Sequence, residues 1–289
     1  MNWSRWWGPR SVRPARGAIH RQLAAVLLAA ALCGCAAEAP VGQAESWDQT
    51  VLFADEFDGP AGALPGGQWH YAKGGGGWGN KELQTYTDNP ENVSLDGNGH
   101  LVITALLDGP EGITSARLMT EGSFEFTHGR AEARIALPAG TGLHPAFWLL
   151  GSNVDDVSWP ECGEIDVIET INLATDYHTG IHAPSAESER GQEIAKSGAV
   201  PFPLAGQFRT YWVERSPGKI VTGIDDRTLF TVKPADLAAK GDWVFDDPFF
   251  LVLNLAVGSD WSGPPDDSTP NPSRMVVDWV RVTAHPSGR

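Results

Sequence analysis

The most constraining feature of this sequence is a succession of short strand-like runs between residues 50 and 284. Runs rich in β-branched and aromatic residues alternate with clusters of Gly, Pro, Asn and Asp, as in strands joined by turns. Only residues 234–240 have the composition of a short helix. Neither an internal repeat nor a second domain is visible, so the pattern predicts one all-β domain, a β-sandwich of two sheets. Examples of the runs are HLVITAL, GRAEARIAL, FRTYWVERS, KIVTGIDD, PFFLVLNLAV and MVVDWVRVT.

Another run, within WPECGEIDVIET, carries three closely spaced acids. Side chains alternate along a strand, so Glu164 and Asp166 share a face that Glu169 would miss. A one-residue bulge at Val167-Ile168 restores the phase and brings all three carboxylates onto one surface. Like charges at such short range hold at least one proton to an unusually high pH. Glycoside hydrolysis requires this pairing of an ionised and a protonated carboxyl group.

The three acids also have two simpler interpretations, as solvated side chains on an exposed strand or as calcium ligands. Their surroundings favour a cleft instead. Trp148 and Trp159 precede them, and Gly163 leaves room beside the first acid. Because sugar rings stack on aromatic faces, acids accompanied by tryptophans indicate a carbohydrate site.

The sequence WPECGEIDVIE resembles the signature of glycoside hydrolase family sixteen, in the bulged form found in bacterial laminarinases (endo-1,3-β-glucanases). The resemblance implies a two-sheet jelly roll whose concave face holds the substrate cleft. It also implies a retaining enzyme that cleaves internal β-1,3 or mixed β-1,3/1,4 bonds of a neutral β-glucan such as laminarin. It extends over residues 50–284 and includes FADEFDG, WGNKELQTYTDNPENV, GRAEARIALPAGTG, PAFWLLG, PFFLVLNLAVGSDWSGPP and VDWVRV.

The resemblance and the chemistry of the acids together suggest three catalytic roles. Glu164 is expected to attack the anomeric carbon, and Glu169 to protonate the departing oxygen and then deprotonate water. Asp166 lies between them, where we expect it to hydrogen-bond to the nucleophile and help Glu169 keep its proton. Two other functions stay open: a surface lipoprotein that binds β-glucan without cutting it, and a β-glucan transglycosylase of the same fold.

Polar and aromatic residues near the acids are predicted to bind sugar. By resemblance, Asn80 is a sugar-binding residue in a Gly-rich loop at the cleft edge. Glu82 and Gln84 alternate with it, and a solvated edge strand explains those two nearly as well. Trp148 and Trp159 are predicted stacking platforms, with a place in the sandwich core as the ordinary alternative.

Three further positions bear on the cleft. By resemblance, His182 lines it beside Glu169. Asn254 interrupts the apolar run FFLVLNLAV and needs a partner if buried, for which we expect a sugar hydroxyl or a catalytic carboxylate. His144 stands where family laminarinases usually carry Trp, a departure that removes one stacking platform and changes the expected specificity.

Arg130, Glu132 and Arg134 share one strand face, opposite small apolar residues. A charged row within a sheet is costly unless its charges are paired or hydrated. We expect this row to face the cleft, where the two arginines would bind substrate and keep Glu164 ionised. A surface ladder of ion pairs is the alternative.

The predicted chemistry requires no redox or organic cofactor. A structural calcium ion on the convex side is a further expectation from the resemblance, held by Glu56, the backbone oxygen of Gly99 and Asp278, since calcium takes oxygen ligands. The alternative for Asp278 is a partner such as Arg281. Cys162 lies two residues before Glu164, where acids would raise its pKa, and we interpret it as a small residue of the cleft wall.

Residues 1–37 have the pattern of an export signal. Several arginines precede an apolar segment, residues 23–32, that is too short to span a bilayer. The letters LCGC resemble a bacterial lipobox, so we expect a lipid at Cys35 and a location in the cell envelope or outside the cell. Ordinary cleavage nearby, an uncleaved anchor and a start codon further in are alternatives. Beyond this signal we expect a polar linker at 38–49, the hydrolase domain at 50–284 and a tail at 285–289.

The charge of the chain restricts its partners. Asp and Glu number 36 against 21 Lys and Arg, for a formal net charge of −15. This field repels nucleic acid and sulfated polysaccharides and is compatible with a neutral glucan, although solubility alone also explains it. We therefore expect a polysaccharide substrate, no nucleic acid and a monomer, with membrane contact through a lipid on Cys35.

Overall fold

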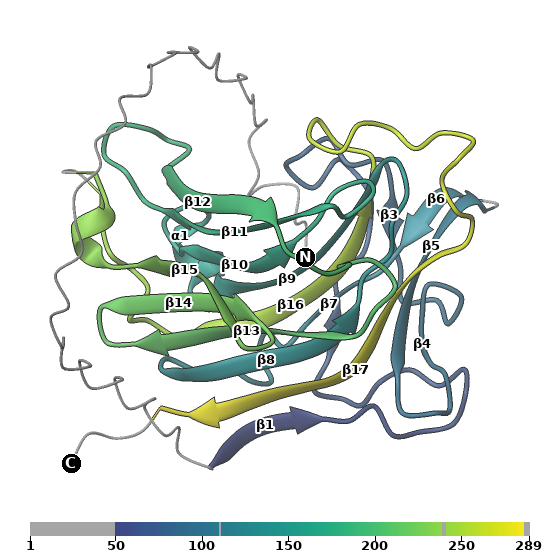
Figure 1. Ribbon diagram of the computed structural model, residues 1–289, viewed down its shortest axis with the longest axis horizontal. Helices are drawn as coiled ribbons and strands as arrows, with labels where there is room; N and C mark the ends of the chain where they lie inside the picture. The colour runs from purple at the N-terminus through teal and green to yellow at the C-terminus, as the bar shows by residue number, and fades with distance from the viewer. Residues whose placement is uncertain (1–49, 110, 239–240, 286–289) are drawn as a thin grey trace, which may run out of the picture.

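The computed structural model describes residues 50–109, 111–238 and 241–285 (Figure 1). The predicted export signal, Cys35 and the linker at 38–49 lie outside the described residues, as does the predicted tail beyond residue 285. Within the described part of the chain, no helix is long and apolar enough to cross a membrane.

Two stacked sheets make up the molecule, as the strand-like runs predicted (Figure 1). The ten-stranded sheet has the order β15-β14-β13-β8-β17-β5-β6-β3, with β1 paired to β17 and β4 paired to β5. Its strands are β1 (Val51–Asp55), β3 (Thr85–Tyr86), β4 (Val93–Leu95), β5 (Leu101–Gly109), β6 (Gly112–Ser115), β8 (Gly129–Ala136), β13 (Arg209–Ser216), β14 (Lys219–Ile224), β15 (Arg227–Val232) and β17 (Ser273–Ala284).

The seven-stranded sheet has the order β12-β11-β10-β9-β16-β7-β2. Its pairs are all antiparallel, and β3 with β6 form the parallel pair of the other sheet. Its strands are β2 (His70–Tyr71), β7 (Arg117–Met119), β9 (Leu143–Gly151), β10 (Glu164–Glu169), β11 (Asp176–Ala183), β12 (Gln192–Ala199) and β16 (Phe249–Val257).

Helical structure in the described residues is confined to short turns. The helix predicted at 234–240 is a 3₁₀ turn, Pro234–Asp236, which has Pro at its start. The four-residue helix α1 (Val154–Val157), between β9 and β10, was not predicted, because one turn has no periodicity to detect.

The hydrophobic core lies between the sheets and follows the alternation along each strand. Ala131, Ala133 and Ile135 of β8 are fully buried, while their neighbours on the strand are half-exposed. Ile165 and Val167 of β10 enter the same core from the other sheet. Each sheet therefore has one apolar face and one face free for polar side chains, and the two polar faces point in opposite directions.

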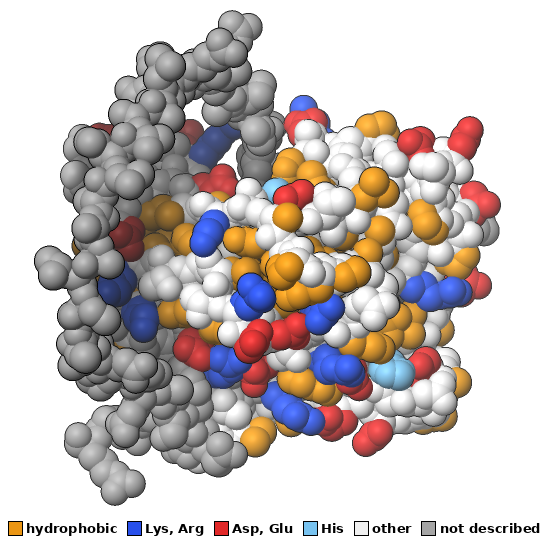
Figure 2. Space-filling model, viewed as in Figure 1, with side chains coloured by type: hydrophobic (Ala, Val, Ile, Leu, Met, Phe, Trp, Pro, Cys, Tyr) orange, Lys and Arg blue, Asp and Glu red, His pale blue; other side chains and the backbone are white. Residues whose placement is uncertain are grey.

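The polar face of β8 carries Arg130 and Arg134, so their predicted place in the cleft is wrong. Arg130 pairs with Glu214 on β13 and lies 2.8 Å from Glu132, and Arg134 pairs with Asp278 on β17. Basic and acidic side chains alternate over β13, β8 and β17 on the face shown in Figure 2. The ion-pair ladder was the correct alternative, because β8 belongs to the sheet whose polar face lies opposite the acids.

Candidate active site

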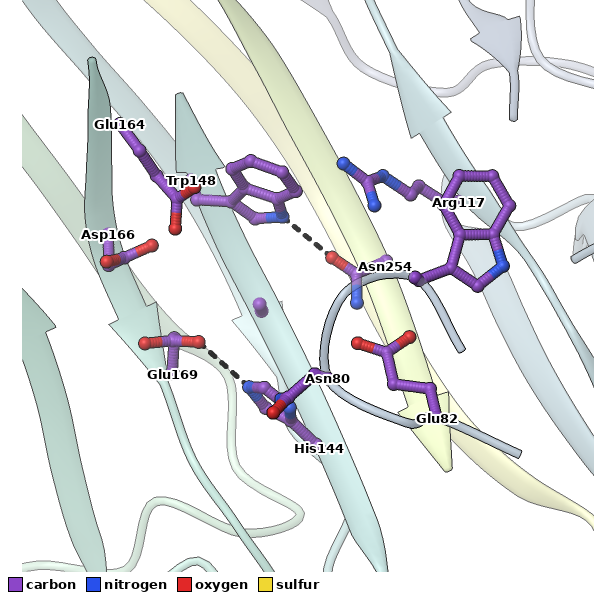
Figure 3. A pocket seen from close by; sticks show the side chains of 11 residues that line it. Asn80, Glu82, Arg117, His144, Trp148, Glu164, Asp166, Glu169 and Asn254 are labelled. Atoms are coloured by element: carbon purple, nitrogen blue, oxygen red, sulfur yellow. Dashed lines mark hydrogen bonds and ion pairs between the residues drawn. The ribbon is translucent and has the colours of Figure 1, made fainter. Parts of the chain in front are cut away.

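Strand β10 carries the three acids on the face that points away from the core. Its register against β9 shifts between Asp166 and Ile168, which confirms the predicted bulge. Val167 and Ile168 are both fully buried in the core, so Glu169 returns to the face of Glu164 and Asp166. Figure 3 shows the three carboxylates following one another along one strand, beside Trp148 and His144.

The acids line two adjoining pockets. Glu164, Asp166 and Glu169 line the first, together with residues of β9, β16 and β7. Asp166 and Glu169 also line the second, a space of 270 Å³ bounded by β11, β12 and Trp261. Glu164 and Asp166 are 3% and 4% exposed, and the side chain of Glu169 is 17% exposed. Glu169 therefore stands between the two spaces, whereas Glu164 belongs to the first.

Two histidines lie against this row of acids. His182 is the register partner of Glu164, and its Nε2 lies 3.3 Å from Asp166 Oδ2 and 3.7 Å from Glu164 Oε1. His182 was predicted to lie beside Glu169. The antiparallel register instead places it beside Glu164. The histidine that contacts Glu169 is His144, with 2.9 Å between its Nε2 and Glu169 Oε1.

Asn254 of β16 lines the cleft, but its amide group has protein partners. The indole N–H of Trp148 donates to Asn254 Oδ1 at 2.7 Å, and Asn254 Nδ2 donates to the Tyr86 hydroxyl at 3.2 Å. The prediction of a sugar hydroxyl or a catalytic carboxylate as its partner is therefore corrected. Asn254 holds Trp148 in place across the adjacent strands β9 and β16.

Arg117 of β7 is a cleft residue that sequence reasoning missed. Its guanidinium group lies 4.5 Å from the ring centre of Trp148 and 5.3 Å from that of Trp78. Burial lowers the pKa of Arg117, and the nearby Tyr86, Glu82 and Glu164 oppose that shift. The guanidinium group of Arg117 lies over one face of the Trp148 ring. A sugar could therefore stack only on the part of the ring that Arg117 does not cover. The available signal was a single Arg among the apolar letters ARLM.

The loop before β3 closes the cleft on one side. Asn80 lines both pockets, as expected of a sugar-binding residue, and Glu82 lines the first. Burial raises the pKa of Glu82, while hydrogen bonds from Gln84 at 2.6 Å and from Tyr86 at 3.3 Å lower it. The solvated edge strand proposed for Glu82 and Gln84 is thus wrong, since Gln84 is fully buried and also accepts from the Val257 N–H at 2.7 Å.

Trp159 and Cys162 lie beside the start of β10. Trp159 is half-buried, and its ring centre is 5.8 Å from that of His182, so it lies near the Glu164 end of the row. Its role as a sugar platform stays a prediction. Cys162 is buried, and burial together with Glu164 raises the pKa of its thiol to about 12, so the thiol is inert. It packs in a buried cluster with Trp148 and Leu150, and is not among the described residues that line the two pockets.

Two groups of residues bear on metal binding. Of the carboxylates predicted for calcium, Glu56 binds Arg281 at 2.8 and 2.9 Å, and Asp278 pairs with Arg134. Calcium binding there would require these ion pairs to open, and it stays a prediction. Glu164, Asp166 and His182 offer three atoms within 4.8 Å of one another, and two of these residues belong to the row of acids on β10. Because glycoside hydrolysis uses such carboxylates directly, their closeness does not require a metal ion.

Comparison with known proteins gives consistent matches for the family and the fold. The family described as "Glycosyl hydrolases family 16" matches residues 78–281. A "Beta-glucanase" of Rhodothermus marinus is 36% identical over 251 residues, which cover 83% of this chain and 86% of the relative.

Solved structures with the same fold include two endo-1,3-beta-glucanases. The catalytic domain of an endo-1,3-beta-glucanase (laminarinase) from Thermotoga petrophila RKU-1 superposes with a TM-score of 0.75 at 34% identity, covering 84% of this chain and 100% of that chain. The endo-beta-1,3-glucanase from Pyrococcus furiosus has a TM-score of 0.73 at 39% identity, with coverages of 82% and 95%. The predicted jelly roll is confirmed.

Proposed function

The chain belongs to family 16 of the glycosyl hydrolases, and from that membership we propose that it hydrolyses internal β-1,3-glucosidic bonds of a neutral β-glucan with retention. The relative and the two solved structures described above, at 34–39% sequence identity, are named as a β-glucanase or endo-1,3-β-glucanases. The net negative charge of the chain and the three acids in the first pocket disfavour an anionic polymer and are compatible with a neutral one.

The observation that carries the proposal is the arrangement of three carboxylates on one face of a bulged strand. Glu164 lines the first pocket, and Glu169 lies where the two pockets meet. A chain lying across both pockets places the sugar to be attacked beside Glu164 and the leaving sugar beyond Glu169. The bond between them is then within reach of both groups, as double displacement requires.

In the first step the Glu164 carboxylate attacks the anomeric carbon while Glu169 donates a proton to the departing glycosidic oxygen. The bond from carbon to that oxygen breaks, and a glycosyl ester on Glu164 forms. In the second step the Glu169 carboxylate takes a proton from water, which attacks the same carbon and releases Glu164. The two inversions together retain the anomeric configuration.

Asp166 separates the two glutamates along the strand and lines both pockets. Its negative charge disfavours ionisation of Glu169 before the first step. His182 lies close to both Asp166 and Glu164, so it is placed to orient these two carboxylates. The role of Asp166 is thus to keep Glu169 protonated before the first step, and the role of His182 is to orient the carboxylates of Glu164 and Asp166.

Release of reducing ends from laminarin tests this function, with wild type compared against Glu164→Gln. We expect steady release by the wild type and a loss of about 10³-fold or more in the variant. ¹H NMR of the first product is expected to show the β anomer. An α anomer at first detection would show that Glu164 is not a nucleophile.

A panel of laminarin, lichenan, agarose and carrageenan separates the possible substrates. We expect cleavage of laminarin, with lichenan reporting tolerance of mixed β-1,3/1,4 bonds. Cleavage of agarose or carrageenan alone contradicts the proposed glucan. Binding without release supports the non-catalytic alternative, and longer products at high oligosaccharide concentration support transglycosylation through the same glycosyl ester.

We also propose that the enzyme is exported as a monomer and tethered through a lipid on Cys35. The support is the basic start, the short apolar segment and the LCGC sequence. Labelled palmitate is expected to enter the wild-type chain and not a Cys35→Ala variant.

Size-exclusion chromatography with light scattering tests whether the protein is a monomer. Thermal melting with and without calcium tests whether Glu56, Gly99 and Asp278 bind that ion, since a bound ion would raise the melting temperature.

A further inference from the structure

His144 enters the cleft from β9 and contacts the predicted acid/base directly. Its Nε2 lies 2.9 Å from Glu169 Oε1 (Figure 3). The register pairs Glu169 with Ala146, and His144 lies two residues before Ala146 on the same strand face. The departure from Trp noted in the sequence thus places a hydrogen-bonding ring where a stacking surface was expected.

The geometry of the ring fixes which nitrogen carries the proton. His144 is 6% exposed, and its Nδ1 is buried with no hydrogen-bond partner among the described residues. A proton on Nδ1 would be a buried N–H without an acceptor, which is unfavourable. Of the two tautomers, the one with the proton on Nε2, donated to Glu169, is therefore favoured.

Packing holds the ring in this orientation. The ring of Trp261 meets that of His144 edge-on, with 5.0 Å between centres and 87° between planes. Trp261 makes the same kind of contact with His178 of β11, at 4.7 Å and 80°. His178 is the register partner of Glu169, so the ring cluster spans both strands that flank the end of β10.

Other charged groups act on the same ring. The titratable side chains that surround His144 come from β10, β11, β7 and the loop before β3. Asp260, next to Trp261 in the chain, forms an ion pair with Lys81 at 2.8 Å. Among them, Glu169 is the group joined to it by the hydrogen bond described above. The surrounding groups are Glu82, Arg117, Glu164, Asp166, Glu169 and His178.

We infer that His144 is a positioning residue for proton transfer, a fixed donor to Oε1 of Glu169 that orients this carboxyl group toward the substrate. This inference rests on the proposed function through the acid/base role of Glu169. A hydrogen-bond donor stabilises the carboxylate more than the acid. His144 therefore helps the proton leave, whereas the charge of Asp166 helps it stay, and the two residues set its affinity from opposite sides.

The matched variants are His144→Leu, which removes the donor, and His144→Gln, which offers an amide N–H of similar reach. For kcat/KM on laminari-oligosaccharides we expect a loss of about 10–100-fold in the Leu variant and about tenfold less loss in the Gln variant. The alkaline limb of the pH profile is expected to move up by about half to one pH unit in the Leu variant.

Leaving-group dependence separates this role from packing. A dinitrophenyl β-glycoside needs no proton at its leaving oxygen, so its kcat/KM is expected to change less than about threefold in His144→Leu. Trp261→Leu removes the packing partner and keeps the donor, and we expect a raised KM with an unmoved alkaline limb. Equal losses on both substrates, or an unmoved alkaline limb in His144→Leu, would overturn the inference.

A measurement without substrate keeps this outcome distinct from failure of the proposed function. In protein labelled with ¹⁵N-histidine, His144 is expected to show a protonated Nε2 and an unprotonated Nδ1, identified by loss of its signals in His144→Gln. A protonated Nδ1 refutes the fixed donor even if laminarin is cleaved. Failure of the wild type to cleave any glucan refutes the proposed function and with it the positioning role of His144.

Discussion

The two sheets carry two rows of charged side chains that look alike in sequence and differ in structure. The cleft row is Glu164, Asp166 and Glu169 on β10, and the outer row is Arg130, Glu132 and Arg134 on β8. Both rows alternate with apolar residues that enter the same core. The outer row has both signs of charge, and its arginines pair with acids of β8, β13 and β17.

The cleft row has only acidic side chains, and its register partners on β11 are His182, Gly180 and His178. Arg117, two strands beyond β9, interacts electrostatically with Glu164 of this row. A row whose charges are matched by its neighbours needs no function to explain it. A buried row with an excess of one sign is unfavourable for stability, and that excess points to chemistry.

The strongest test of this contrast is neutralisation of one acid in each row. Glu164→Gln is expected to reduce kcat on laminarin by about 10⁴-fold, because no other group on β10 is placed to form the glycosyl ester. Its melting temperature should stay the same or rise, since one of three like charges is removed. Reducing-end assays and thermal melts measure both effects.

Glu132→Gln in the outer row is the control for that experiment. We expect activity within about twofold of wild type and a small loss of stability, in the range of about 0–1 kcal/mol for a partly exposed ion pair. If the Glu132 variant lost activity as the Glu164 variant does, the separation of the two rows into structural and catalytic sets would fail.

The second test removes the middle acid of the cleft row. Asp166→Asn takes a negative charge from beside Glu169, so Glu169 ionises more readily and the protonated acid is lost at lower pH. The alkaline limb should move down by about one pH unit, with about 10²-fold loss of kcat. This shift is opposite to the one expected for His144→Leu. A pH-rate profile with an unmoved alkaline limb would show that Asp166 acts only by geometry.

The strand pattern made the fold predictable from the sequence. The run GRAEARIAL became β8 and EIDVIET became β10, because alternation fixes which side chains are buried once a sheet forms. The bulge was predictable for the same reason: only an extra residue returns Glu169 to the face of Glu164. Local periodicity therefore determined both the catalytic strand and its irregularity.

Alternation could not say which of two polar faces a row would occupy. That depends on which sheet a strand joins, a long-range property, and the error over Arg130 and Arg134 follows from it. The partners of Asn254 and the contact between His144 and Glu169 also depend on inter-strand register. Arg117 was missed because its strand has three residues, too few for a pattern.

The third test breaks the balance of the outer row. Arg130 pairs with Glu214 and Glu132 and lies 4.1 Å from the ring centre of Trp212. Arg130→Gln leaves two acids side by side without their shared cation, and we expect a loss of about 1 kcal/mol, or about 2–4 °C in melting temperature. The loss should shrink at 1 M salt, where like charges are screened. A salt-independent loss would assign the effect to stacking on Trp212 instead.

The smallest expected effect comes from two acids outside both rows, Glu121 in the turn after β7 and Asp155 in α1, that have no assigned chemistry. Glu121 follows β7, and burial, with a further contribution from Asp155, raises its pKa from 4.5 to about 7. Between these two values the folded protein binds more protons than the unfolded chain. Its contribution to stability is therefore present below pH 4.5 and is lost as the pH rises through 7.

Glu121→Gln mimics the protonated side chain at every pH. The variant should be more stable than wild type at pH 8, by about 1 kcal/mol after allowance for solvent screening of a half-buried group. That corresponds to about 2–4 °C in melting temperature, and the difference should vanish near pH 4.5. Asp155→Asn should produce a smaller gain, because burial is the larger cause. If the activity also changed in Glu121→Gln, an excess of negative charge would indicate function outside β10 as well. If only the stability changed, such an excess would indicate chemistry only where the carboxylates line a pocket that holds substrate.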